Sequence, residues 1–206
     1  MRKIYYTYPE ISNIKSRVLS RKYDNDMTYL SLEKTIFMPS SDILLDEPGF
    51  ISGKRIKKTY EKNGKVIHLI EGRESRKEVI LTLDKDIRYR NLSYATGFFL
   101  FKIFFNSFYL NHKVDFSLNK YEGLIYINDW VNDFDPKLIE NQINYAIDKG
   151  LRIESSKGIL EIKGLGKTIN NLIAFDNTYK VKNFKIKDIE KAKDKMTISF
   201  LTGKDI

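Results

Sequence analysis

One long apolar run constrains the fold of this chain more than any other feature. From Leu92 to Leu110 the sequence lacks strand-like alternation, and its length suits a buried α-helix with Asn91 or Ser93 near its start. Polar residues, among them Lys102, interrupt the run, which is shorter than the roughly 20 apolar residues that span a bilayer. Other elements must therefore cover this helix, and we expect no membrane association.

The residues before this run have a different pattern. Short apolar segments at 17–19, 28–32 and 65–69 predict strands, and the middle one alternates cleanly. Asn63-Gly64 predicts a hairpin turn, because both residues accept a positive φ. We expect a small antiparallel β-barrel or sandwich that forms a domain over residues 1–75.

The residues after the run predict a mixed second domain. Asp135-Pro136 opens a helix that Gly150 ends, with proline at its first position and apolar residues at helical spacing. Strands are expected at 113–116, 124–128, 159–162, 180–186 and 196–200. The predicted fold class is α+β, with a small N-terminal β-barrel-like domain and a larger α+β domain over 85–206.

Charge and composition narrow the classes of function. Lys and Arg number 36 against 27 Asp and Glu in 206 residues, and the net charge of +9 suits a polyanionic partner. Without cysteine there is no disulfide, thiolate metal site or cysteine nucleophile, and His68 and His112 are the two imidazoles. The N-terminus lacks the apolar core of a signal peptide, so a cytoplasmic protein is expected.

Four segments, in order, carry a resemblance to a known family. The first, 35–49, keeps Thr35, Phe37, Pro39 and Gly49, and the strand that contains His68 follows it. The second, 88–100, has an Arg-rich lead-in, and the third is the strand 125–128 with the helix 136–149. The fourth reads Phe-Asp-Asn-Thr-Tyr-Lys-Val over 175–181. Together they resemble the AlaX-type alanyl-tRNA editing family, including the editing domains of alanyl- and threonyl-tRNA synthetases.

The resemblance implies a zinc-dependent aminoacyl-tRNA hydrolase whose metal ligands are missing here. In the family, two His lie four residues apart on one helix, and a Cys and a further His complete the same zinc site. The matching positions are Ala95, Phe99, Phe175 and Tyr179. None is a zinc ligand in this setting, so we expect neither a metal nor another cofactor. We expect the three aromatic side chains to fill the volume of the lost site.

An enzyme that needs no metal is the alternative. Polar residues near the matched positions would then form the pocket of an ester hydrolase, although no His falls inside a matching motif to act as base. These residues are Arg88, Asn91, Ser93, Thr96, Asp176, Asn177 and Thr178. A protein-interaction scaffold, as a homodimer for example, is the other alternative.

The favoured hypothesis is a protein that binds tRNA or aminoacyl-tRNA after loss of the hydrolase chemistry. Its candidate contacts are two basic clusters interleaved with aromatic residues. The clusters comprise Lys54, Arg55, Lys57 and Lys58 in the first domain, and Lys182, Lys185 and Lys187 in the second. On a regular strand Lys182 and Lys185 would face opposite sides, so a single basic stripe needs a break or bulge in this strand.

Overall fold

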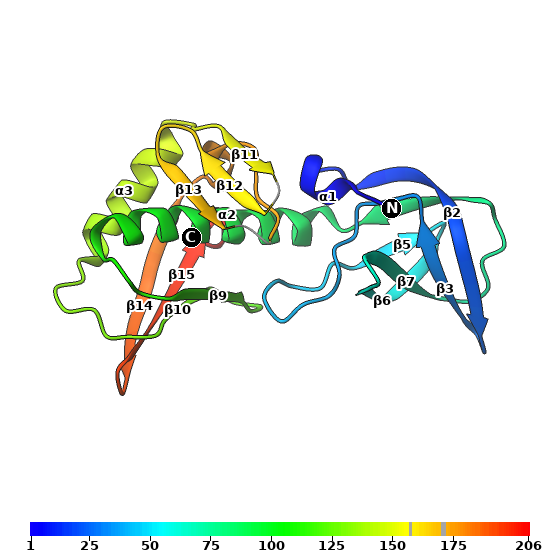
Figure 1. The fold of residues 1–206 in the computed structure, drawn as a ribbon, viewed down its shortest axis with the longest axis horizontal. Helices are drawn as coiled ribbons and strands as arrows, with labels where there is room; N and C mark the ends of the chain where they lie inside the picture. Colours follow the sequence, from blue (N-terminus) through cyan, green and yellow to red (C-terminus); the bar gives the residue numbers. More distant parts are fainter. Residues whose placement is uncertain (157, 170–171) are drawn as a thin grey trace. The chain divides into compact units, whose positions relative to one another are not determined.

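A computed structural model describes residues 1–156, 158–169 and 172–206 of the chain (Figure 1). The chain divides into two compact units, Met1–Tyr89 and Arg90–Ile206, and the division falls inside the long helix α2 (Lys85–Phe108). No helix within the described ranges is long and apolar enough to cross a membrane. Helices and several sheets occur together, and the predicted α+β class is confirmed.

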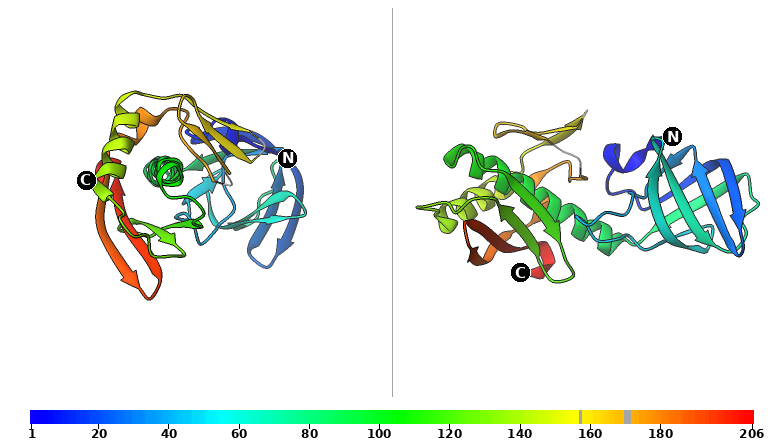
Figure 2. Two further views of the ribbon diagram at one scale, coloured as in Figure 1. Left: turned by 60° about the vertical axis from the view of Figure 1, so that its left-hand side comes forward. Right: turned by 60° about the horizontal axis from the view of Figure 1, so that its bottom comes forward.

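The first unit is built around a closed barrel in which antiparallel strands pair in the order β2, β3, β7, β6, β5, β8 (Figure 2). A short parallel pair, β1 with β4, and the helix α1 accompany it. The elements are β1 (Arg2–Lys3), α1 (Ile4–Thr7), β2 (Asn13–Asp24), β3 (Met27–Leu32), β4 (Lys34–Thr35), β5 (Gly49–Ile51), β6 (Lys54–Lys62), β7 (Lys65–Glu71) and β8 (Glu78–Leu83).

The barrel interior follows from the period of two along its strands. Leu30 and Leu32 of β3, Ile70 of β7 and Leu81 of β8 are buried in one apolar cluster, while the residues between them face the other side. The predicted hairpin at Asn63-Gly64 is confirmed, because both residues have positive φ and Lys62 pairs with Lys65.

Strand β8 lies beyond the limit of residue 75 that the sequence analysis gave to the first domain. Its residues alternate between exposed and buried, and it pairs with both β2 and β5 to close the barrel. The charged residues around 73–78 precede this strand, whose buried residues Val79, Leu81 and Leu83 belong to the core. The two domains, with limits 1–75 and 85–206, stay a prediction.

The second unit places two sheets and the helix α3 around α2, which Figure 2 shows end on in its left view. The larger sheet has the order β14-β15-β10-β9 and is antiparallel, and the smaller has the order β11-β12-β13. The elements are β9 (Val114–Leu118), β10 (Gly123–Ile127), α3 (Pro136–Asp148), β11 (Ile153–Ser156), β12 (Ile159–Ile162), β13 (Gly166–Ile169), η1 (Thr178–Val181), β14 (Phe184–Ala192), β15 (Lys195–Thr202) and η2 (Gly203–Asp205).

Helix α2 packs its aromatic residues on the larger sheet. The Tyr94 and Phe200 rings lie 5.4 Å apart, and the Phe98 and Phe116 rings are stacked at 4.8 Å. The sheet approaches closely at Gly97, where an added Cβ would lie 2.9 Å from Cγ2 of Thr202. Small side chains on this face of α2 therefore set the distance between helix and sheet.

The predicted start of this helix was wrong. It begins at Lys85, after Asp84, whose carboxylate accepts hydrogen bonds from the N–H groups of Asp86 and Ile87 at 2.9 and 3.1 Å. The apolar pattern identified the buried part of the helix but not its charged first turns. Asn91 and Ser93 lie inside the helix and are buried.

The helix predicted from Asp135-Pro136 is confirmed as α3. Asp135 caps it by accepting from the N–H of Leu138 at 3.0 Å, and Gly150 adopts a positive φ just after its end. The strand predicted over 180–186 was partly wrong, because the 3-10 turn η1 occupies its first residues and β14 begins at Phe184.

Candidate functional site

Thr35, the first residue of the first segment, is part of a hydrogen-bonded chain in the barrel core. The N–H of Phe37 donates to Oγ1 of Thr35 at 3.1 Å, and this hydroxyl lies 2.8 Å from Nε2 of the buried His68. On the other side of the ring, Nδ1 is 3.3 Å from the carbonyl oxygen of Leu30. This carbonyl can only accept, so Nδ1 carries the proton and Nε2 accepts from Thr35. Burial lowers the pKa of His68 to about 4.

Phe37 and Gly49 of the first segment fit against each other. A Cβ at Gly49 would lie 2.5 Å from Cε1 and Cζ of Phe37 and 2.6 Å from the carbonyl oxygen of Thr82. Only glycine therefore lets β5 approach this ring and pair with β8. The residues of this segment that match the family thus organise the barrel core.

Arg88, which opens the second segment, is buried in an ion pair with Glu47. Its Nε and one terminal nitrogen donate to the two carboxylate oxygens at 2.5 and 2.6 Å, and further bonds reach the carbonyl oxygens of Pro9 and Ile36, each at 2.6 Å. These contacts use the guanidinium as a clamp between α2 and the loop before β5. Arg88 therefore has a structural role, and its predicted role in a hydrolase pocket is not supported.

Three of the four matched ligand positions are apolar and buried. Ala95 and Phe99 lie one helical turn apart on α2, and Phe175 is as deeply buried as they are. The N–H of Phe175 donates to Oγ1 of Thr96 at 3.0 Å, so the fourth segment lies against α2 at the residue next to Ala95. None of these side chains offers a nitrogen, sulfur or carboxylate donor for zinc.

Tyr179 departs from the expectation that it fills the former site. Its side chain is 57% exposed and lines an open surface pocket of about 440 Å³ together with Arg152 and Glu154. The reason lies in the preceding residue, Thr178, which turns its own side chain inward at the start of η1. The prediction that three aromatic rings fill the volume is therefore wrong for Tyr179.

Thr178 and Asn177 attach the fourth segment to the end of α3. The Thr178 hydroxyl donates to the carbonyl oxygen of Ala146 at 2.6 Å and accepts from the N–H of Leu151 at 2.8 Å. The amide of Asn177 donates to the carbonyl oxygen of Gly150 at 2.9 Å, and its oxygen accepts from Tyr179 N–H at 3.0 Å. Both side chains form hydrogen bonds that hold this turn. Thr178 therefore has a structural role that does not require zinc.

The remaining polar residues of the predicted pocket also have structural partners. The Ser93 hydroxyl donates to Oγ1 of Thr202 at 3.0 Å, and Asp176 forms an ion pair with Lys180 at 2.8 Å. Asn91 is buried and also has an interaction partner. Neither Ser93 nor Thr96 has a histidine among these partners, so the described residues show no base that could activate either hydroxyl.

No group of three or more His, Cys, Asp or Glu side chains within the described residues is arranged to hold a metal. His112, which follows α2 at the end of the apolar run, lies 3.2 Å from a carboxylate oxygen of Asp129. The side chains at the matched positions therefore do not fit a zinc ion, on the chemistry of their atoms.

The two basic clusters differ in how much of their charge is neutralised. Lys57 and Lys187 form ion pairs with Glu71 and Glu122 at 3.0 and 2.7 Å. Within the described part of the chain, no ion pair involves the other members, which are Lys54, Arg55, Lys58, Lys182 and Lys185. Lys182 has a positive φ and lies before β14, so the chain is not a regular strand between Lys182 and Lys185, and a bulge follows between Ile186 and Asp188.

Sequence comparison places the chain near one class of protein, the alanyl-tRNA editing proteins, and no protein-family model matches it. The chain is similar to the alanyl-tRNA editing protein AlaX-L of Pyrococcus horikoshii, to which it is 25% identical over 138 residues, or 63% of this chain. The chain spans 34% of the length of that relative. The predicted resemblance to the AlaX-type family is thereby confirmed as a sequence similarity.

Proposed function

We propose that the protein binds tRNA or aminoacyl-tRNA as an editing-like protein in which the zinc-dependent hydrolase site has been lost. One observation carries the proposal. The family-like framework residues Thr35, Phe37, Gly49 and Thr178 keep specific contacts, whereas the matched ligand positions carry side chains that cannot bind zinc. A framework that keeps these contacts without donors for a metal fits a binding function better than a catalytic one.

The charge of the protein supports an RNA partner. With a net charge of +9, the chain attracts phosphate, and among the described residues four members of its two basic clusters, Arg55, Lys58, Lys182 and Lys185, form no ion pair with an acidic side chain. The name of the relative also refers to alanyl-tRNA. We infer that cations such as Lys182 and Lys185 contact the phosphate backbone of tRNA, with little contribution from Lys187, which is held by Glu122.

A mobility-shift assay with bulk tRNA, paired with a deacylation assay on mischarged tRNA, tests the proposal. We expect salt-dependent binding and no deacylation, either with or without a chelator. Deacylation that a chelator does not affect would point instead to the metal-independent hydrolase. Absence of binding at low salt would point to the scaffold, for which the oligomeric state is the next measurement.

A further inference from the structure

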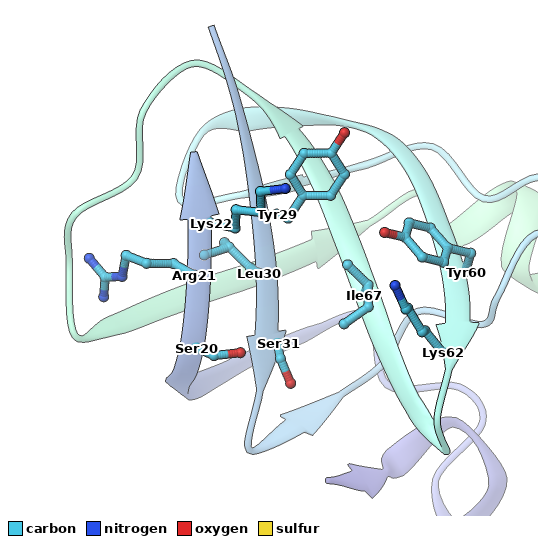
Figure 3. A pocket seen from close by; sticks show the side chains of 9 residues that line it. All are labelled: Ser20, Arg21, Lys22, Tyr29, Leu30, Ser31, Tyr60, Lys62 and Ile67. Carbon is cyan, nitrogen blue, oxygen red and sulfur yellow. The ribbon is translucent and has the colours of Figure 1, made fainter. Parts of the chain in front are cut away.

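The outer face of the barrel carries a pocket that the four segments do not include. Strands β2, β3, β7 and β6 contribute to it, and its volume is about 340 Å³ (Figure 3). This size is at the lower end of the range of about 300 to 1,000 Å³ that is usual for small-molecule sites. Because Leu30 and Leu32 of β3 point into the barrel, the alternate residues Tyr29 and Ser31 face outward into this pocket.

The pocket offers flat apolar surface on neighbouring strands. Tyr29 comes from β3 and Tyr60 from β6, and Ile67 lies on β7, the strand between them. Figure 3 shows both phenol rings standing on this face around Ile67. Aromatic rings next to an aliphatic side chain form a surface on which a planar heterocycle can stack.

The charged side chains beside these rings are positive, and two of them form no ion pair within the described ranges. Figure 3 shows the Lys22 ammonium beside Tyr29 and the Lys62 ammonium beside Tyr60. Neither lysine forms an ion pair with any residue in the described ranges, and no acidic side chain belongs to the described lining. Arg21 differs, since it points away and donates to the carbonyl oxygens of Glu74 and Arg76.

Ser31 adds an observation that is independent of charge. Its residue is 4% exposed, it lines the pocket, and its hydroxyl has no hydrogen-bond partner among the described residues. A buried hydroxyl without a partner reduces stability, and native proteins seldom keep one without reason. A polar atom of a ligand in this pocket would satisfy it.

We propose that this pocket binds a nucleotide unit, with the base stacked on Tyr29 or Tyr60 and the phosphate held by Lys22 and Lys62. The Ser31 hydroxyl then forms a hydrogen bond with a polar atom of the same ligand. The nucleotide is either free or one residue of a single-stranded RNA. This site lies entirely within the unit Met1–Tyr89, and it goes beyond the proposed tRNA function, on which it does not depend.

Titration of the full chain at low salt with three probes tests the site. The probes are AMP, a short single-stranded oligoadenylate and inorganic phosphate. We expect AMP to bind at least about tenfold more tightly than phosphate, because stacking adds to charge. A free-nucleotide site would bind AMP and the oligomer equally, whereas an RNA site would prefer the oligomer. Failure of both AMP and the oligomer to bind, or equal binding of phosphate and AMP, overturns the proposal.

Variants separate a ligand site from a structural feature. Tyr60→Ala should weaken AMP binding about 5- to 100-fold, and Lys62→Ala should weaken it and reduce its salt dependence. The exposed residues Tyr8 and Lys15 lie outside the lining, so Tyr8→Ala and Lys15→Ala should bind like the wild type. Unchanged affinity in both pocket variants contradicts the assignment.

Ser31→Ala gives the sharpest result. It removes a hydroxyl without a partner, so the melting temperature should stay equal or rise, while the affinity for AMP falls. Ser31→Ala that binds AMP as well as the wild type overturns the role of this hydroxyl. This test is separate from the tRNA assay. If the protein binds tRNA but binds neither AMP nor the oligomer, the nucleotide site is refuted and the proposed function is unaffected.

Discussion

Oγ1 of Thr35 lies 2.8 Å from Nε2 of His68 in the core of the barrel. The opposite nitrogen of the ring faces the carbonyl oxygen of Leu30, so the neutral imidazole satisfies both partners and a second proton would face the Thr35 hydroxyl. A histidine of the family-like framework is thus fixed in its neutral form by the fold. These contacts give His68 a structural role in the barrel core.

The stability of the protein should depend on pH through this histidine. Burial lowers the folded-state pKa of His68 from 6.5 to about 4, so between these values the unfolded state binds more protons. The free energy of unfolding therefore rises by on the order of 3 kcal/mol as the pH increases from about 4 to 6.5. Acidification through the same window removes this contribution of His68. Urea unfolding of wild type and His68→Gln from pH 4 to 7 measures it. An equally steep dependence in the variant would contradict the assignment.

Gly49→Ala should destabilise the barrel by about 1 to 3 kcal/mol, because the new methyl group would overlap the Phe37 ring and the Thr82 carbonyl. The carbonyl is backbone in a strand pair and cannot move aside. Gly166→Ala is a matched control, since among the described residues its Cβ would meet the side-chain end of Ile103, at 3.2 Å, and no backbone atom. Thermal unfolding of both variants should show a large loss for the first and a small one for the second.

Glu47→Gln should cost about 3 to 5 kcal/mol in the free energy of unfolding, because it leaves the Arg88 guanidinium buried without its counter-charge. Arg88→Lys should also be costly, since an ammonium cannot reproduce the two-pronged contact or reach both carbonyl oxygens of Pro9 and Ile36. Denaturant titration gives the values. Near-wild-type stability of both variants would instead reopen a functional role for Arg88.

Local chemistry made part of this fold predictable from sequence. The Asn63-Gly64 turn and the capped start at Asp135 each depend on residues that determine their own backbone conformation. The start of α2 was missed because its first turns are charged and their cap, Asp84, precedes the apolar pattern by several residues. Strand β8 was missed because its role depends on pairing with distant β2 and β5.

The candidate sites depend even more on contacts between distant segments, which a sequence pattern does not reveal. The sequence alignment located Ala95, Phe99 and Phe175, but the exposure of Tyr179 follows from the bonds of Thr178 to α3, which no local pattern reveals. The nucleotide pocket was missed as a unit because its residues come from separate strands. Alternation along β3, which leaves Tyr29 and Ser31 outside the core, was the available signal.

Truncation at the positions that match the family's metal ligands should separate core residues from surface residues. Phe99→Ala and Phe175→Ala should each lower the free energy of unfolding by about 3 to 5 kcal/mol through the cavity they leave. Tyr179→Ala should change it by less than about 1 kcal/mol, because its ring is largely exposed. Equilibrium unfolding measures all three. A large loss for Tyr179→Ala would show that its ring packs into the core after all.

The second basic cluster offers a test of RNA contact that depends on ion pairing. Lys182 and Lys185 have no acidic partner among the described residues, whereas Lys187 lies 2.7 Å from Glu122. Each free cation that neutralises a phosphate releases condensed counterion, so Lys182→Ala with Lys185→Ala should reduce the slope of log affinity against log salt by roughly 1.4 to 1.8. The measurement is tRNA binding by filter retention across a series of salt concentrations.

Lys187→Ala is the control for this double variant, because it removes one lysine charge from β14, the strand that also contains Lys185. Since Glu122 already neutralises Lys187, its loss should change the salt slope by much less than the roughly 0.7 to 0.9 expected for a full phosphate contact. If Lys187→Ala changed the slope by as much as each lysine of the double variant does on average, only the net charge of the protein would matter for binding. No effect of the double variant would place the RNA surface elsewhere, and the cluster around Lys54, Arg55 and Lys58 would be the next to test.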